Sequence, residues 1–130
     1  MEAPTDAECP FCHPERARVI AQHSHFFVYQ DGFAVSPGHT LVIPYQHVAT
    51  IADLSADEQA ALFPAVLNAQ RRLDESHRPD GYNIGINQGA AGGQTVPHLH
   101  VHVIPRYHGD QPDPRGGIRW IFPDKADYWS

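Results

Sequence analysis

The run His98–Ile104 constrains this chain more than any other segment, because three histidines alternate in it with apolar residues. Strict alternation predicts a β-strand with one buried face, since successive side chains of a strand point to opposite faces of the sheet. The apolar residues then enter a core, and the three imidazoles share the other face. Histidine serves near neutral pH as base, acid, nucleophile or metal ligand, so three on one rigid element predict a functional site.

Length and composition indicate one acidic globular domain. The chain has 130 residues, of which 42% are hydrophobic and 18% charged, and its net charge is −6 with histidine neutral. This balance argues against a broad nucleic-acid groove but not against a small phosphorylated ligand. Residues 1–6 lack the apolar stretch of a leader or membrane span, and two cysteines three apart do not suggest a secreted framework. We therefore expect one domain over 1–130, in the cytoplasm, with no membrane or nucleic-acid partner.

The rest of the chain contains signals for further strands and one helix. Aromatic and β-branched residues bounded by turn residues predict strands over 26–31, 39–44 and 82–87, and 33–35 is expected to continue the first after a turn. Residues 15–21 are read as a short helical or extended link.

Ser55 and Glu58 have the spacing of a capping box, which predicts a helix after Ser55 with an apolar stripe that packs on a sheet. Pro64 is expected to kink or split this helix. Several antiparallel strands and one main helix make an α+β domain.

A loop of small residues, 89–95, directly precedes the histidine run. Small residues let backbone amides approach a ligand, and successive amides form an anion nest, so the loop is a candidate phosphate cradle. Asn87, Gln94 and Thr95 add polar side chains. Beside such a cradle, one histidine attacks phosphorus and another assists the leaving group. His100, with a histidine on either side, is best placed as the nucleophile.

Cys9 and Cys12 form a Cys-x-x-Cys clip, a spacing typical of zinc sites when histidines follow later in the chain. Two thiols without a metal, or a redox pair, are the alternatives.

Together these motifs resemble the histidine triad (HIT) family of nucleotide hydrolases and transferases. The resemblance rests on the 98–104 run, the loop 87–96, and Asp31 ahead of the Pro37-Gly38-His39 turn, and it covers about 9–106, leaving 107–130 as a tail. It implies a HIT-like fold with a five-stranded antiparallel sheet and one main helix, paired into a homodimer. The transferase branches commonly carry Gln at the third histidine position, so His102 favours hydrolysis.

The resemblance also implies a role for each site residue. His100 is the nucleophile, and His102 contacts the phosphate and assists the leaving group. The residues implied at the nucleotide and phosphate are Asp31, Asn87, Gln94, Thr95, Tyr29 and Phe26. One structural zinc ion per chain is implied on Cys9, Cys12, His47 and His98. The implied reaction cleaves nucleoside phosphoramidates, dinucleoside polyphosphates or related conjugates at the α-phosphorus. It passes through a nucleotidyl-histidine intermediate and releases a nucleoside monophosphate.

Other readings remain open. His98 and His100 form an H-x-H pair that can share a catalytic zinc with water, which predicts a metallohydrolase. A non-catalytic nucleotide sensor keeps Asp31 and the loop without using a nucleophile, and a nucleotidyltransferase is a third reading. His39, at the start of a strand, is expected to be structural. In the tail, Arg115, Arg119 and Trp120 either reach a ligand or only pack.

Overall fold

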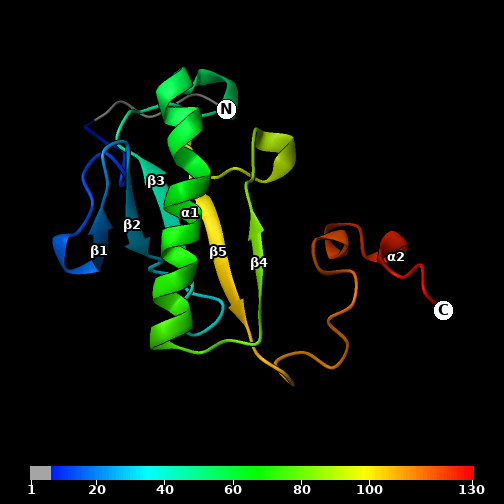
Figure 1. Cartoon of the computed structure of the whole chain (residues 1–130). Helices are drawn as coiled ribbons and strands as arrows, with labels where there is room; N and C mark the ends of the chain where they lie inside the picture. Colours follow the sequence, from blue (N-terminus) through cyan, green and yellow to red (C-terminus); the bar gives the residue numbers. More distant parts are fainter. Residues whose placement is uncertain (1–6) are drawn as a thin grey trace.

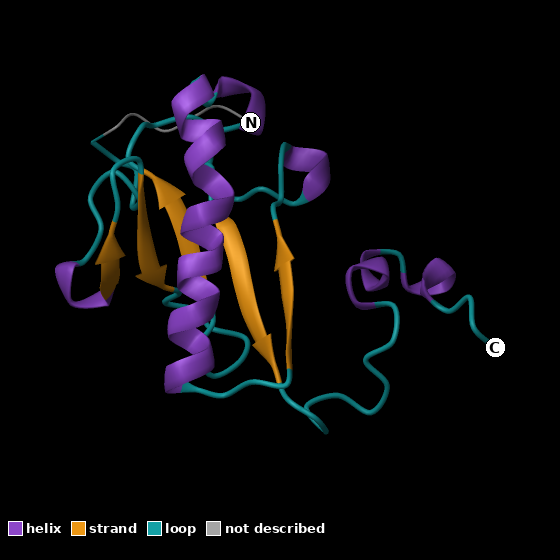
Figure 2. Ribbon diagram, viewed as in Figure 1, coloured by secondary structure: helices purple, strands orange, loops and turns teal. Residues whose placement is uncertain are grey.

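A computed structural model describes residues 7–130; residues 1–6, in which the sequence predicts no leader segment, lie outside the described residues. The described chain forms a five-stranded antiparallel sheet of order β1-β2-β3-β5-β4, with one long helix across one face (Figures 1 and 2). This confirms the predicted architecture. The strands are β1 (Val19–Gln22), β2 (Phe26–Gln30), β3 (Thr40–Pro44), β4 (Gly81–Gly85) and β5 (Val101–Arg106), and the helices are α1 (Ala56–Ser76) and α2 (Pro123–Ala126).

The sheet has two different faces because successive side chains of each strand point to opposite sides of it. One face packs against α1 and forms the main core, which includes Phe26, Val28, Val42, Leu62, Val66, Leu73, Leu99, Val101 and Val103. The opposite face carries a smaller buried cluster of Phe27, Tyr29, Leu41 and Ile43. The alternation in β5 places the three histidines on this second face, away from α1.

Helix α1 begins as predicted. The Ser55 hydroxyl accepts a hydrogen bond from the Glu58 amide at 3.1 Å, and the Glu58 carboxylate accepts one from the Ser55 amide at 2.7 Å. The expected split at Pro64 is wrong, because the helix runs unbroken from Ala56 to Ser76. Pro64 is exposed while Leu62 and Val66 are buried. Burial of the flanking apolar turns offsets the backbone hydrogen bond that proline removes.

The histidine strand begins later than predicted, at Val101 rather than His98. Strand β3 ends at Pro44, which has no N–H to continue a ladder, and the Leu99 amide donates instead to the Val48 carbonyl at 2.7 Å. The alternation still holds, with Leu99 buried in the same core as Val101.

Residues 15–21, expected as a short helical or extended link, contain the 3-10 turn η1 (Arg16–Arg18) and the start of β1. Two expectations were wrong: residues 33–35 form no strand, and β4 is Gly81–Gly85 rather than 82–87. In Figure 1 the tail lies beside β4, and it contains a 3-10 turn, η4 (Gly117–Ile121), followed by α2. Within residues 7–130 no helix is long and apolar enough to cross a membrane.

Candidate functional site

The histidine row leads into an inner strand of the sheet, because β5 runs between β3 and the edge strand β4. His98 and His100 are buried and His102 is half-buried. The ring centroids of His100 and His102 are 5.1 Å apart, and the Phe11 ring packs edge-on against His100 at 5.0 Å. The clip residue Phe11 therefore covers the row at the cysteine end, while His102 stands at the other end.

The backbone sets the tautomer of His100. Its Nδ1 lies 2.8 Å from the carbonyl oxygen of His98. A carbonyl only accepts hydrogen bonds, so Nδ1 carries the proton and Nε2 keeps its lone pair. A neutral imidazole oriented in this way is suited to attack an electrophile through Nε2.

A hydrogen-bonded chain sets the tautomer of His102 in the opposite sense. The Val35 amide donates to Nδ1 of His39 at 3.1 Å, so the His39 proton is on Nε2. This Nε2 lies 2.9 Å from Nδ1 of His102 and 3.3 Å from a carboxylate oxygen of Asp31. His102 therefore accepts at Nδ1 and carries its own proton on Nε2. Burial, helped by the neighbouring His100 and His39, lowers the pKa of His102 to about 4, so the ring is neutral at pH 7.

Sequence reasoning missed the link between His39 and His102. Thr40 pairs with Val103 and Leu41 with His102 across β3 and β5, so His39 approaches the histidine row only through this register. The sequence signal that could have indicated this link is the period of two in a strand, which places His39 on the same face as Leu41. Asp31, His39 and His102 also resemble a cation site, but the protonated Nε2 of His39 makes them a hydrogen-bonded chain.

The small-residue loop has the backbone expected of a phosphate cradle. Gly89 and Gly93 have φ of 79° and 88°, a region that favours glycine. Gln94 is buried, its Oε1 accepts from the Gly89 amide at 2.9 Å, and its Nε2 donates to the Ala49 carbonyl at 3.0 Å. Both ends of this amide are hydrogen-bonded, so Gln94 holds the 89–95 loop in its conformation. Asn87 and Thr95 are exposed beside it.

The two aromatic residues expected beside a nucleotide base lie on different faces of the sheet. Tyr29 is on the histidine face, but it is buried, accepts a hydrogen bond from the Glu15 amide at 2.9 Å, and lies under the Arg18 guanidinium. Phe26 is fully buried in the core beneath α1. A contact with a base does not fit that position, and Phe26 is left out of the proposed site.

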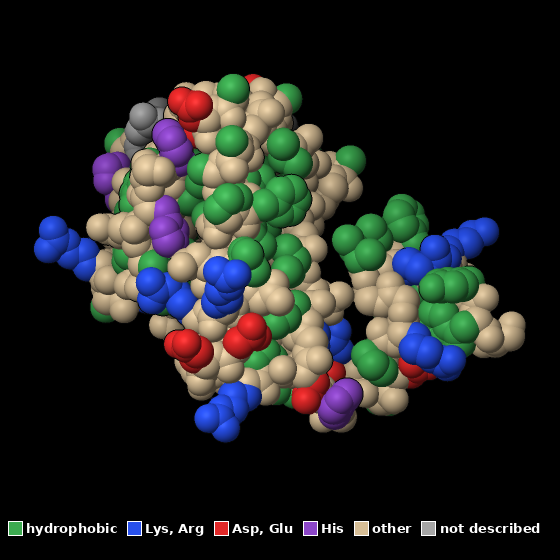
Figure 3. Space-filling model, viewed as in Figure 1, with side chains coloured by type: hydrophobic (Ala, Val, Ile, Leu, Met, Phe, Trp, Pro, Cys, Tyr) green, Lys and Arg blue, Asp and Glu red, His purple; other side chains and the backbone are tan. Residues whose placement is uncertain are grey.

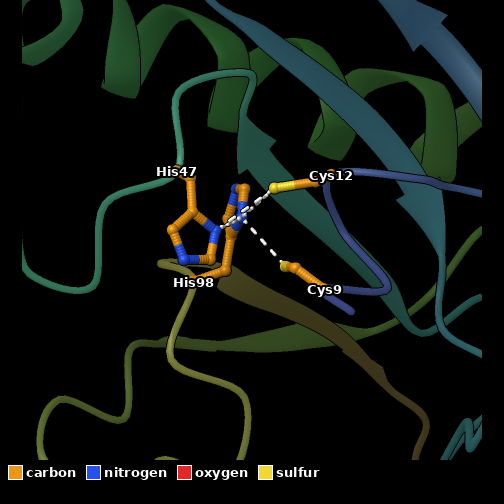
Figure 4. A group of neighbouring side chains, drawn as sticks. All are labelled: Cys9, Cys12, His47 and His98. Atoms are coloured by element: carbon orange, nitrogen blue, oxygen red, sulfur yellow. Dashed lines mark hydrogen bonds between the residues drawn. The ribbon is translucent and has the colours of Figure 1, made fainter. Parts of the chain in front are cut away.

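Figure 4 shows the four expected metal ligands converging from the N-terminal clip, the segment after β3 and the start of the histidine row. Cys9 Sγ is 3.3 Å from Nδ1 of His98, and Cys12 Sγ is 3.2 Å from Nδ1 of His47. The two Nδ1 atoms are themselves 3.2 Å apart. All four ligand atoms lie within 4.8 Å of one another.

The chemistry of this cluster fits a tetrahedral zinc ion. Ligands at Zn–S of about 2.3 Å and Zn–N of about 2.0 Å lie roughly 3.3–3.8 Å from each other around the metal. Nε2 of His98 lies 2.8 Å from the Pro44 carbonyl oxygen, so the His98 proton is on Nε2 and Nδ1 offers its lone pair to the thiols. A metal-bound histidine commonly donates its other N–H to a carbonyl in this way.

Fold, histidine row and ligand cluster together define a histidine triad domain. The sequence matches the HIT domain family over residues 14–109, and the chain belongs to this family. It is similar to a Zn-bound histidine triad family protein from Mycobacterium smegmatis, with a TM-score of 0.72 and 34% identity over 83% of this chain and 86% of that one.

Two curated relatives are named for reactions of dinucleoside polyphosphates. An AP-4-A phosphorylase from Mycobacterium tuberculosis is 38% identical over 79% of this chain and 53% of its own length. A bis(5'-nucleosyl)-tetraphosphatase from Schizosaccharomyces pombe is 43% identical over 58% of this chain and 42% of its own length. The chain thus spans about half the length of these relatives.

Proposed function

We propose that this protein is a nucleotide hydrolase that cleaves nucleotidyl conjugates at the α-phosphorus through a covalent intermediate on His100. The observation that carries the proposal is the pair of opposite tautomers. Nε2 of His100 holds a lone pair, while Nε2 of His102 holds a proton, and each is set by a hydrogen bond at the other ring nitrogen. One ring is arranged to attack and its neighbour to donate.

In the first step Nε2 of His100 forms a bond to phosphorus, and the bond from phosphorus to the leaving nitrogen or oxygen breaks. Nε2–H of His102 donates a hydrogen bond to the leaving atom or a phosphate oxygen, and the leaving group departs with a proton drawn from solvent. Backbone amides of the 89–95 loop stabilise the phosphate oxygens. In the second step water attacks phosphorus, His100 is released, and the proton is returned to solvent with the nucleoside monophosphate.

Two carbonyl contacts hold the nucleophile in place. The His98 side chain donates to the Pro44 carbonyl, and the His98 carbonyl accepts from Nδ1 of His100. A zinc ion on Cys9, Cys12, His47 and His98, when bound, supplies a closed structural crosslink with no open coordination position. These contacts favour His98 as a support for His100 over its use in a catalytic metal site.

The homodimer also belongs to the proposal. β4 is an edge strand, and the sheet ends there within the described chain. On α1 the side chains of Phe63 and Leu67 are 76% and 44% exposed, and Ile84 on β4 is 42% exposed. An open strand edge and apolar residues of this size favour pairing with a second copy. Sedimentation equilibrium at micromolar protein concentration tests this, and a monomeric mass contradicts it.

The covalent intermediate tests the proposed function directly. The protein is mixed with radiolabelled adenosine 5'-phosphoramidate or diadenosine tetraphosphate, and the reaction is stopped with denaturant at alkaline pH. Label is expected on the wild-type chain and not on His100→Ala. His23→Ala, at a half-buried histidine bonded to Asn68 on α1, is the matched control and should retain the label. Nucleotide binding without turnover of either compound favours the sensor, and product that changes from AMP to ADP when inorganic phosphate is added favours a transferase.

A further inference from the structure

Arg18 covers the Tyr29 ring with a planar cation. Its guanidinium carbon lies 4.5 Å from the centre of the ring. Val19 pairs with Tyr29 across β1 and β2, and this register brings the preceding residue, Arg18, alongside the ring. Of the cation–π contacts within residues 7–130, the others lie in the C-terminal tail. The histidine face of the sheet therefore has an arginine platform of its own.

The surroundings of the guanidinium hold it against the ring. Its Nε donates to the Gln30 carbonyl at 3.1 Å, and a terminal nitrogen donates to the Glu15 carboxylate at 3.4 Å. Gly32 lies against the other terminal nitrogen, which would be only 2.7 Å from an added Cβ. With its edge engaged and its inner face on Tyr29, the Arg18 guanidinium keeps its outer face for a ligand, and its side chain is 28% exposed. An arginine held in this way is suited to stack on a planar ring.

Phe11 connects this platform with the proposed reaction centre. The centroid of its ring lies 6.3 Å from that of Tyr29 and 5.0 Å from that of His100, both in edge-on contact. Phe11 and Arg18 are half-buried, so both keep surface for a ligand. The row leads toward β1, at the edge of the sheet opposite to β4, so the proposed homodimer leaves it uncovered. A nucleotide attacked by His100 therefore has a planar surface within reach of its base.

The charge of the platform restricts which base it accepts. Glu15 bonds the edge of the guanidinium and not its face, and its side chain is 71% exposed, so water screens the pair. Figure 3 shows the other face of the sheet, with α1, where basic and acidic side chains are interspersed. On the histidine face, a neutral base stacks on the Arg18 cation, whereas a base that carries a positive charge is repelled by it.

We propose that Arg18 is a specificity-determining residue that stacks on neutral bases and rejects bases with a positive charge. The proposal rests on the function proposed above and refines it, because it restricts the substrates to conjugates of nucleotides with uncharged bases. Tyr29, which the sequence places at the base, supports Arg18 from beneath instead.

The test compares two isomers of methylated AMP. In 1-methyl-AMP the methyl group on a ring nitrogen leaves the base positively charged at neutral pH, whereas the isomer with the methyl group on the 6-amino nitrogen is neutral. Isothermal titration calorimetry measures both dissociation constants, so the readout needs no turnover. We expect wild type to bind the neutral isomer about tenfold more tightly or better, because two unit charges in contact at a half-exposed surface repel each other.

Two variants remove the platform in different ways. Arg18→Ala uncovers the Tyr29 ring, whose face attracts a cation, so the preference for the neutral isomer should disappear or reverse. Gly32→Ala keeps the charge of the chain but puts a Cβ where the guanidinium lies, so the preference should fall toward one. Arg16→Ala is the matched control, because Arg16 is exposed in the same 3-10 turn and the substitution removes the same charge. It should keep the wild-type preference.

Equal binding of the two isomers by wild type, or an unchanged preference in Arg18→Ala, overturns this inference. So does failure to bind either isomer at millimolar concentration. The labelling of His100 decides the proposed hydrolase separately. A chain that takes no label yet shows the preference is not the proposed hydrolase, and Arg18 then selects the base in a nucleotide sensor.

Discussion

The substitution Gln94→Ala tests whether Gln94 holds the 89–95 loop in the conformation that the proposed reaction needs. The substitution removes an acceptor for the Gly89 amide and a donor for the Ala49 carbonyl, at 2.9 and 3.0 Å. Each neutral hydrogen bond contributes about 1 kcal/mol net, so the free energy of unfolding should fall by about 2 kcal/mol. Gly89 is exposed, so a hydrogen bond to water partly replaces the one that its amide loses.

The effect on activity should exceed what unfolding explains. A loop that no longer presents its amides in one geometry stabilises the phosphate oxygens less well, and losing one such donor costs on the order of 10²-fold in rate. We expect kcat/KM to fall by about tenfold or more in protein that is folded by circular dichroism, with the covalent intermediate still detectable on His100. Urea unfolding and steady-state kinetics on adenosine 5'-phosphoramidate measure the two quantities.

Gln88→Ala provides the matched control. Its side-chain oxygen accepts one hydrogen bond, from the Ile51 amide at 2.9 Å, and the residue lies exposed at the start of the same loop. It should lower the free energy of unfolding by about 1 kcal/mol or less and change kcat/KM by less than about threefold. If Gln94→Ala loses stability yet keeps the wild-type kcat/KM, Gln94 does not position the cradle and the argument is refuted.

Three other perturbations test separate parts of the structure. The pKa of His102 is lowered to about 4 in the folded state, so its contribution to stability is present above about pH 6.5 and is lost as the pH falls toward 4. When Tm is measured against pH, the fall in Tm on acidification should be smaller for His102→Asn than for wild type. Chelation should release one zinc ion per chain and lower Tm by about 10 °C or more. The variant Cys12→Ser should retain no tightly bound metal. A wild-type protein that loses its metal with no change in Tm contradicts the zinc site. Ser55→Ala removes the helix cap and should lower the free energy of unfolding by about 1 kcal/mol, measured by urea titration, with kcat/KM unchanged.

Local signals predicted the elements on which the site is built. The alternation of histidines with apolar residues places both the core and the functional face of β5, because a strand has a period of two. The capping box at Ser55 predicts the start of α1 for an equally local reason, since both partners lie within one turn. Boundaries were less accurate. Pro64 does not end α1, because packing on the sheet outweighs a local penalty. Strand β5 begins only at Val101, where it pairs with Val42 of β3.

The sequence by itself determined the chemistry available: a row of histidines on one face, a small-residue loop before it, and a cysteine clip with histidines to complete it. Tertiary structure decided how each residue is used. Only strand register joins His39 to His102 and so sets the proton positions, and only the packing of two distant loops turns Gln94 into a brace. The fold buries Phe26 in the core beneath α1, away from the histidine face, and the path of the tail places Trp120 and His102 on one cleft. These outcomes depend on contacts between residues far apart in the chain, and residue type and spacing alone do not specify such contacts.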